Sequence, residues 1–368
     1  MNMAPIRVGI IGLSATSSWA VTAHLPYLKS SPKYQITGVC NSTLTSSTAA
    51  IAAHALSPTT TKPYGSVADL AASPDIDLVV VSTRVDRHYA SLKPALEAGK
   101  DCFVEWPLAS NLQQATELLE LAERKGVRTF VGLQGRFHPA IARIKDLLDS
   151  NAIGKVLSSH VELAAGIATA EAPEHLEYLN LVEYGGNVLT IPFGHLHDSM
   201  STVLGEQESV SATLSVQRPD VAIKSADGTV FRTIQRTAAD RIAISGLLAN
   251  GVPSTALVHG RGPLKDEPGL VWRVEGGKGV IDVRSKHAFA VSMSVAEVEV
   301  RVHDLETGEV RLVEVGDDRP GPPGNVGRVY EAFADGEGVA DWKLAVKRHA
   351  WVEAVYESDR SGKRVVCS

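Results

Sequence analysis

The sequence has 368 residues with 36 basic and 42 acidic side chains, so its formal net charge is −6. This length allows roughly two domains with cores of their own. Apolar residues make up 44% of the chain and charged residues 21%, which excludes a disordered protein. A mildly acidic chain lacks the basic surface that binds phosphate backbones, so we expect no direct nucleic-acid partner.

The three cysteines, Cys40, Cys102 and Cys367, have no CxxC spacing and indicate neither a disulfide framework nor a zinc site. The N-terminal residues lack the basic and long apolar segments of a signal peptide. No apolar run reaches the roughly 18 residues that a membrane helix needs. We therefore expect a reduced, cytoplasmic protein without a membrane partner.

Residues 1–135 alternate between short apolar runs and stretches with helical spacing. The expected strands are 7–12, 34–39, 78–82, 101–105 and 129–133, and the expected helices are 19–28, 43–55, 69–73, 88–98 and 113–125. This alternation is typical of a doubly wound parallel sheet, the Rossmann fold of α/β proteins, with ligands at the carboxyl ends of the strands. We assign residues 1–135 to a dinucleotide-binding domain.

Residues 136–368 have a different pattern, with longer alternating strands. A helix is expected at 140–149, strands at 209–216, 241–248, 254–258, 270–275, 279–283 and 298–305, and two final helices at 326–334 and 342–358. Such strands favour a large, open, mostly antiparallel sheet with helices on one face. We assign residues 136–368 to an α+β substrate domain.

The turn after the first strand is Gly12-Leu13-Ser14-Ala15-Thr16-Ser17-Ser18. A Rossmann fingerprint has three glycines here, which let the backbone approach a pyrophosphate at a helix N-terminus. Only Gly12 remains, but Ser14, Ala15 and Thr16 are small, and hydroxyls can donate to phosphate oxygens. The alternative is a serine-rich loop that caps the helix and binds no ligand.

Two other strand ends would contact a dinucleotide. An NAD site usually has a carboxylate after the second strand, for the adenosine ribose. Here Asn41 and Ser42 follow instead, which favours NADP over NAD because no carboxylate repels a 2′-phosphate. Thr83, Arg84 and His88 follow the strand 78–82, where ribose and nicotinamide would pass, although Arg84 equally fits an ordinary exposed loop arginine.

Several phrases of the sequence carry a family resemblance. They are Phe103-Val104-Glu105-Trp106-Pro107-Leu108, Gly135-Arg136-Phe137-His138-Pro139, Gly194-His195-Leu196-His197-Asp198 and the C-terminal run from Trp342 to Ser358. With them, nearly the whole chain resembles the glucose–fructose oxidoreductase/inositol dehydrogenase (Gfo/Idh/MocA) family. Within that family, Ser18-Trp19-Ala20, Leu133-Gln134-Gly135-Arg136 and Phe193-Gly194-His195 are similar to the fungal galactose-pathway repressor group.

The resemblance implies a changed catalytic set. Trp106 stands at the position of the family's catalytic lysine and Ile191 at that of its aspartate, whereas His195 stands at its catalytic histidine. An imidazole suits general acid–base work, and an indole cannot act as a base. Tyr184 is a second candidate acid. The structural alternatives are a hydrogen-bonding role for His195 and a packed ring for Tyr184.

The remaining candidates would line the pocket. Trp106 is expected beside the nicotinamide, either as a stacking surface or as the wall of an inactive pocket. Glu105 and Gln134 line the pocket on family grounds only. His197 and Asp198 either support His195 or cap the following helix. His195 and His197 have no third ligand in the pattern, so we expect no metal.

Two functions remain open. The first is an NAD(P)-dependent oxidoreductase that moves hydride between nicotinamide and a carbinol or carbonyl of a sugar-like or other polar small molecule. The second is a catalytically inactive NADP-binding regulator, cytoplasmic or nuclear, whose cleft receives a transcription-activator segment. The resemblance also implies a homodimer.

Overall fold

The computed structural model describes residues 4–367. The chain forms two compact units, Met1–Leu133 with Pro322–Val346, and Gln134–Gly321 with Lys347–Ser368. The division after Leu133 lies beside the predicted boundary at 135/136. The segment Pro322–Val346, which the sequence analysis assigns to the second domain, instead packs within the first unit.

The first unit is built on a parallel sheet of six strands, in the order β3-β2-β1-β4-β5-β6. The strands are β1 (Ile6–Ile11), β2 (Tyr34–Cys40), β3 (Lys62–Tyr64), β4 (Leu78–Val81), β5 (Asp101–Glu105) and β6 (Thr129–Gly132). Leu78–Val81 is buried at every position, as a strand covered on both faces must be. The predicted Rossmann fold is confirmed.

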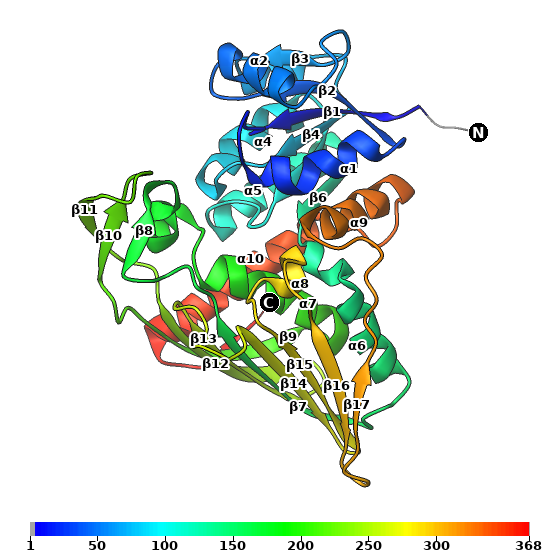
Figure 1. The fold of residues 1–368 in the computed structure, drawn as a ribbon, viewed down its shortest axis with the longest axis vertical. Coiled ribbons are helices and arrows are strands. Elements are labelled where there is room, and N and C mark those ends of the chain that lie inside the picture. Colours follow the sequence, from blue (N-terminus) through cyan, green and yellow to red (C-terminus); the bar gives the residue numbers. More distant parts are fainter. Residues whose placement is uncertain (1–3, 368) are drawn as a thin grey trace. The chain divides into compact units, whose positions relative to one another are not determined.

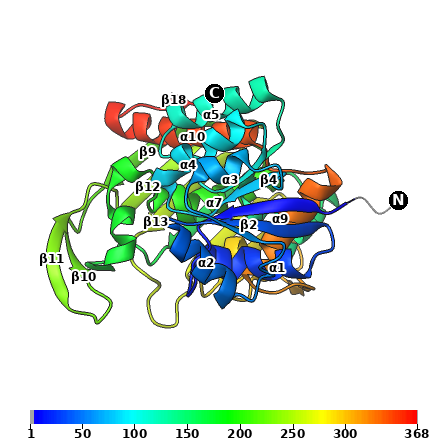
Figure 2. The ribbon, with the colours of Figure 1, turned by 90° about the horizontal axis from the view of Figure 1, so that it is seen from above.

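Helices cover both faces of this sheet, with α1 and α9 on one side and α3 and α4 on the other (Figure 2). The helices are α1 (Leu25–Ser30), α2 (Leu44–Ala53), α3 (Val67–Ala72), α4 (His88–Glu97), α5 (Leu112–Lys125) and α9 (Pro322–Asp335), with a 3-10 turn η2 (Val85–Arg87). The helix expected at 19–28 is a π-helical turn, η1 (Ala20–His24), that continues into α1.

Aromatic packing explains why the segment Pro322–Val346 belongs to the first unit. The Tyr330 ring on α9 stacks on Tyr27, with ring centroids 5.5 Å apart. The Tyr34 hydroxyl donates to the Tyr330 carbonyl at 2.6 Å. The Trp342 indole donates to the Phe130 carbonyl of β6 at 3.2 Å. These long-range contacts leave no pattern in the local sequence.

The second unit contains a nine-stranded sheet in the order β17-β16-β15-β14-β7-β13-β12-β9-β18 (Figure 1). The strands are β7 (Val156–Ala164), β9 (Gln207–Ser215), β12 (Arg241–Leu248), β13 (Pro253–His259), β14 (Leu270–Gly276), β15 (Gly279–Ser285), β16 (Glu299–Asp304), β17 (Val310–Val313) and β18 (Val365–Val366). The pairing of β7 with β13 is parallel, and the other pairs of this sheet are antiparallel. The predicted α+β architecture is confirmed.

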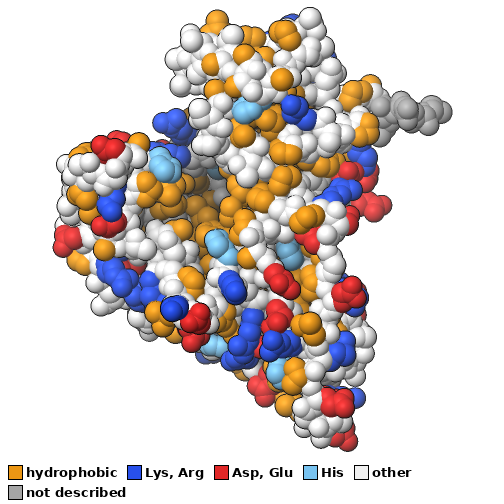
Figure 3. All heavy atoms as spheres, in the orientation of Figure 1, with side chains coloured by type: hydrophobic (Ala, Val, Ile, Leu, Met, Phe, Trp, Pro, Cys, Tyr) orange, Lys and Arg blue, Asp and Glu red, His pale blue; other side chains and the backbone are white. Residues whose placement is uncertain are grey.

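Helices pack on one face of this sheet. They are α6 (Pro139–Asp149), α7 (Gly194–Leu204), α8 (Ala290–Met293) and the part of α10 (Trp342–Ser361) from Lys347 onward. Their apolar side chains, such as Ile144, Leu196 and Trp351, form one core with Val161 and Trp272 of the strands. The opposite face carries the alternate residues. Figure 3 shows basic and acidic side chains side by side over the β14–β17 end.

Smaller elements complete the second unit. They are the sheet β11-β10-β8, formed by β8 (Glu171–Pro173), β10 (Asp220–Lys224) and β11 (Val230–Gln235), the 3-10 turns η3 (Gln134–Phe137), η4 (Glu174–Asn180) and η5 (Val182–Tyr184), and the π-helical turn η6 (Leu189–Phe193). No strand was expected at β11, because five of its six residues are exposed and no buried face marks it in the sequence.

Candidate functional site

Gly12 sits where β1 turns into the loop before η1, and only glycine fits there. Its φ is +98°, a region that L side chains rarely adopt. A Cβ at this position would lie 2.3 Å from the Ser82 carbonyl oxygen at the end of β4. The loop backbone therefore runs directly against the carboxyl end of the sheet, where a Rossmann fold binds its ligand.

This loop presents unused polar groups. The backbone N–H groups of Ser14, Ala15 and Ser17 make no hydrogen bond within residues 4–367. At the same edge of the sheet, the Ser82 hydroxyl is buried and has no partner in the described structure. The N–H groups fit the oxygens of a pyrophosphate, and the buried Ser82 hydroxyl also favours a partner, because a buried donor without one costs free energy. The polar groups of this loop therefore fit the pyrophosphate of a dinucleotide.

Asn41 supports the loop. Its side-chain amide donates to the Leu13 carbonyl at 2.8 Å and to the Ser46 carbonyl at 3.3 Å. Ser42 next to it is exposed, and Thr43 caps α2 through a capping box with Ser46. Ser42 is thus the better placed of the two predicted residues to meet a ribose substituent, since the Asn41 donors already hold the loop.

Arg84 and His88 are both engaged within the first unit. The Arg84 guanidinium binds Asp86 through two hydrogen bonds of 3.0 and 2.8 Å. The His88 ring is 1% exposed and spans two carbonyl oxygens, that of Thr83 at 3.0 Å and that of Pro107 at 2.8 Å. Burial lowers the pKa of His88, although both carbonyls oppose this shift. This geometry favours a role for His88 in joining the ends of β4 and β5.

Glu105 ends β5 as part of a buried polar network that the sequence analysis missed. Its Oε1 atom lies 2.7 Å from Nε2 of His24, and Nδ1 of His24 lies 2.8 Å from the Tyr330 hydroxyl. A Cβ on Gly132 would lie 2.8 Å from the other carboxylate oxygen. The next residue, Trp106, is 4% exposed and belongs to the apolar cluster of the first unit.

In the second unit, η3 lies against α7 and brings several predicted residues together. A Cβ on Gly135 would lie 2.6 Å from the Ser199 hydroxyl. His195, in the first turn of α7, is 7% exposed. Gln134 is 2% exposed, and its Oε1 atom is buried without a hydrogen-bond partner in the part of the chain described. An unpaired buried acceptor fits a ligand that donates a hydrogen bond.

Asp198 is fully buried between two arginines. Arg136 of η3 donates two hydrogen bonds of 3.0 and 2.7 Å to its carboxylate, and Arg348 of α10 donates a third at 2.9 Å. Arg348 also binds Glu206, at 2.6 and 3.1 Å. This charged network favours the positioning of α7 over direct contact between Asp198 and a substrate.

His197 points into apolar packing. Its ring stacks on Trp351 with centroids 3.7 Å apart, and burial, with a smaller contribution from the Arg348 charge, holds its pKa well below the usual 6.5. Tyr184 is half-buried in η5, and Ile191 lies in η6 just before α7. The roles assigned from the sequence to these residues stay predictions.

Within residues 4–367, His, Cys, Asp and Glu side chains form no group of three or more that could hold a metal ion. No helix in this part of the chain is both long enough and apolar enough to cross a bilayer.

Comparison with known proteins identifies the family. Residues 6–133 match the Gfo/Idh/MocA model, described as "Oxidoreductase family, NAD-binding Rossmann fold", and residues 139–285 match "Gal80p, C-terminal domain". Dehydrogenase aclE of Aspergillus oryzae is 30% identical over 373 residues, which cover 97% of each chain. The chain belongs to the Gfo/Idh/MocA oxidoreductase family. The resemblance stated from the sequence is confirmed.

The galactose/lactose metabolism regulatory protein GAL80 of Saccharomyces cerevisiae is a second relative. It is 32% identical over 301 residues, which cover 78% of this chain and 69% of that protein. The crystal structure of a super-repressor mutant of this Gal80p matches with a TM-score of 0.89 at 26% identity, covering 99% and 98% of the two chains. The similarity to the repressor group is therefore confirmed as well.

Levoglucosan dehydrogenase, solved in a complex with NADH and L-sorbose, has the same fold. The TM-score is 0.79 at 18% identity, with 100% of both chains covered. The relatives of this chain thus include a dehydrogenase and a regulator. Residues 6–133 match an NAD-binding Rossmann fold.

Proposed function

We propose that this protein is an NAD(P)-dependent oxidoreductase that transfers hydride between nicotinamide and a carbinol or carbonyl of a sugar-like or other polar small molecule. The loop that begins at Gly12 supports the coenzyme part of this proposal, because the backbone N–H groups of Ser14, Ala15 and Ser17 are unpaired in the described structure. The alignment with a dehydrogenase over 97% of both chains supports catalysis.

The first unit would hold the coenzyme through its own loop groups. The N–H groups of Ser14 and Ala15 would meet the phosphates, as would the Ser82 hydroxyl. Ser42, exposed and uncharged, supports NADP(H) over NAD(H), since a 2′-phosphate meets no carboxylate there.

The bound nicotinamide supplies or accepts the hydride. His195 would donate a proton to the carbonyl oxygen in reduction, or take one from the hydroxyl in oxidation. Asp198, through Arg136, holds α7 and so fixes the position of His195. Tyr184 is the second candidate acid. The Trp106 indole cannot take a proton and is left with a packing or stacking role.

The proposed oxidoreductase activity is tested by measuring coenzyme binding and turnover. The purified protein is titrated with NADPH and NADH by fluorescence and then assayed by nicotinamide absorbance against a panel of sugars and carbonyl compounds. We expect tighter NADPH binding, and turnover that His195→Ala abolishes and that His175→Ala, an exposed histidine of η4, leaves unchanged. Turnover that survives in His195→Ala would remove His195 as the acid–base group.

A second candidate is a regulator that binds NADP(H) without catalysis and receives a transcription-activator segment. Trp106 at the lysine position and the match of residues 139–285 to the Gal80p C-terminal domain support it. Coenzyme binding without turnover on the whole panel, together with saturable binding of an activator peptide that NADPH changes, would favour this candidate over the enzyme.

The outward face of the nine-stranded sheet is the proposed homodimer interface, on the basis of the family resemblance. Its β12 and β13 strands carry Ala243, Ser245, Thr255 and Leu257 outward. Light scattering should give twice the monomer mass for the native chain and the monomer mass for Ala243→Arg. A monomeric native chain would contradict the proposal.

A further inference from the structure

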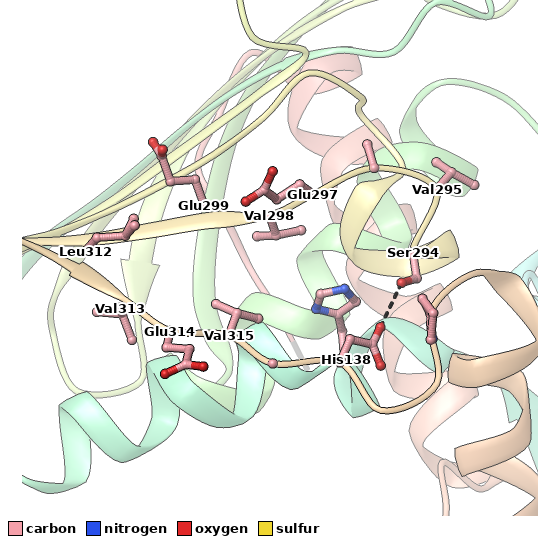
Figure 4. A pocket seen from close by; sticks show the side chains of 14 residues that line it. His138, Ser294, Val295, Glu297, Val298, Glu299, Leu312, Val313, Glu314 and Val315 are labelled. Carbon is pink, nitrogen blue, oxygen red and sulfur yellow. Dashed lines mark hydrogen bonds between the residues drawn. The ribbon is translucent and has the colours of Figure 1, made fainter.

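A cavity of about 620 Å³ is lined by residues of the second unit, among them 294–299 and 312–317 (Figure 4). The Ser294 hydroxyl donates to Asp317 at 3.1 Å at one end of this cavity. None of these residues belongs to the coenzyme loop, which is part of the first unit. The contact that extends the coenzyme site lies in the first unit and is made by His54.

His54 binds the loop that begins at Gly12. Its Nε2 atom lies 2.7 Å from the carbonyl oxygen of Ser14. A carbonyl oxygen only accepts, so Nε2 carries the hydrogen and donates it. The direction is the same for a neutral and a protonated ring, because a protonated imidazole donates from both nitrogens. Forty residues separate the two partners, so no local pattern links His54 to the loop.

The end of α2 places the His54 ring. His54 is the C-cap of this helix, and Ala55 after it has a φ of +50°. The Leu56 N–H donates to the Ile51 carbonyl at 3.0 Å. A left-handed residue with such a bond closes a helix in a Schellman motif. Main-chain bonds therefore fix the position of His54, and its side chain is left to bind the loop.

A second helix meets His54 from the other side of the chain. Nζ of Lys29, an exposed residue of α1, donates to the His54 carbonyl oxygen at 2.9 Å. α1 follows the coenzyme loop in the sequence. Both the loop and the helix that follows it are thus joined to the end of α2 at a single residue.

The contact with Ser14 fixes the orientation of one peptide group. The Ser14 carbonyl and the Ala15 N–H belong to the same planar trans peptide, so they point in opposite directions. The bond from His54 therefore turns the Ala15 N–H away from the imidazole. That N–H makes no hydrogen bond within residues 4–367 and is one of the donors proposed for the coenzyme phosphates.

We propose that His54 is a positioning residue for the pyrophosphate of the coenzyme. By holding the Ser14 carbonyl, it keeps the Ala15 N–H directed to the phosphate oxygens and opposes a turn of the peptide that would present the carbonyl oxygen to them. A hydrogen bond to the carbonyl also polarises the peptide, which strengthens its N–H as a donor. The inference rests on the proposed function in one respect, since a dinucleotide must bind this loop.

The experiment titrates the full chain with NADPH and NADH by fluorescence and follows the coenzyme that binds more tightly. His54→Leu removes the donor and should weaken binding roughly tenfold, the effect of one misplaced hydrogen bond to a charged ligand. His54→Gln keeps an N–H donor close to the position of Nε2 and should restore most of the affinity. A residue that only stabilised the helix end would not give this recovery.

Thr48→Leu is the control, because Thr48 is exposed on the same helix and its hydroxyl donates to the Leu44 carbonyl. It should keep the native affinity. Urea denaturation should show little change in the free energy of unfolding of His54→Leu, since the bonds that close α2 are main-chain bonds.

Native affinity in His54→Leu would overturn the inference, as would a His54→Gln protein that binds no better than His54→Leu. A large loss of stability in His54→Leu would also overturn it, by making His54 a structural residue. A native chain that binds neither NADPH nor NADH would instead overturn the coenzyme part of the proposed function, and the inference with it.

Discussion

Nε2 of His24 lies 2.7 Å from Oε1 of Glu105, so the π-helical turn after the coenzyme loop is tied to the end of β5. An ionised carboxylate only accepts, so the Nε2–H of His24 donates to it. The second ring nitrogen, 2.8 Å from the Tyr330 hydroxyl, extends the link to α9. One buried imidazole thus joins three segments that are remote in the sequence.

His24→Phe should destabilise the first unit strongly. It leaves the buried Glu105 carboxylate without its partner, which costs about 3–5 kcal/mol. Tyr330→Phe removes only one neutral hydrogen bond and should cost about 1 kcal/mol. Urea denaturation of the two variants measures the difference in the free energy of unfolding. Similar losses in both would show that Glu105 does not depend on His24.

Gly12→Ala should abolish coenzyme binding. The new Cβ would overlap the Ser82 carbonyl oxygen and push the loop away from the sheet. Gly99→Ala is the matched control, because Gly99 also has a positive φ, +72°, but nothing lies within 4 Å of its Cβ position. NADPH titration should therefore show unchanged affinity in Gly99→Ala. Comparable NADPH affinity in both variants would contradict a coenzyme site at the Gly12 loop.

Five of the six parallel strands of the first unit were predictable because buried strands are uninterrupted apolar runs, whereas β3, which has no buried residue, was not predicted. Leu78–Val81 is the clearest example. The exposed β11 and the return of Pro322–Val346 to the first unit were not predictable. Both depend on tertiary contacts, such as Tyr330 on Tyr27, that no local period reveals.

The candidate site likewise contains residues that the sequence reveals and residues that only the fold reveals. Gly12 was evident from the sequence, since a positive φ at the end of a strand selects glycine. The partners of Asp198 were hidden, because Arg348 lies 150 residues away. His24 likewise carries no motif that links it to Glu105. Spacing reveals residues of one turn or helix, whereas charge networks assembled from several elements become visible only in the fold.

Asp198→Asn should destabilise the second unit by about 3 kcal/mol, because it leaves the buried Arg136 guanidinium without its anion and leaves Arg348 with Glu206 alone. Asp149→Asn removes an exposed pair with Lys145 and should cost less than about 0.5 kcal/mol. Urea denaturation provides the comparison. A stable Asp198→Asn protein with lost activity would instead assign Asp198 to the chemistry.

Ser42→Asp should turn the coenzyme preference towards NADH. A carboxylate at this exposed position repels a 2′-phosphate and accepts from ribose hydroxyls. We expect NADPH affinity to fall roughly tenfold, equivalent to about 1.4 kcal/mol, with little loss for NADH. Thr48→Asp adds the same charge on the exposed side of α2 and should change neither affinity. A parallel loss for both coenzymes would place Ser42 outside the ribose site.

The free energy of unfolding should fall as the pH drops below about 6.5, the pKa of an ordinary histidine. Burial holds the pKa of His197 well below 6.5 in the folded chain. Below about pH 6.5 the unfolded chain therefore binds a proton that the folded chain excludes, and the free energy of unfolding decreases by up to about 1.4 kcal/mol per pH unit.

His197→Phe keeps a ring on Trp351 without a titrating group, so its denaturation midpoint should fall less between about pH 7 and pH 5. His175→Phe, at an exposed position, should keep the native slope. An unchanged slope in His197→Phe would mean that the buried ring does not exclude the proton.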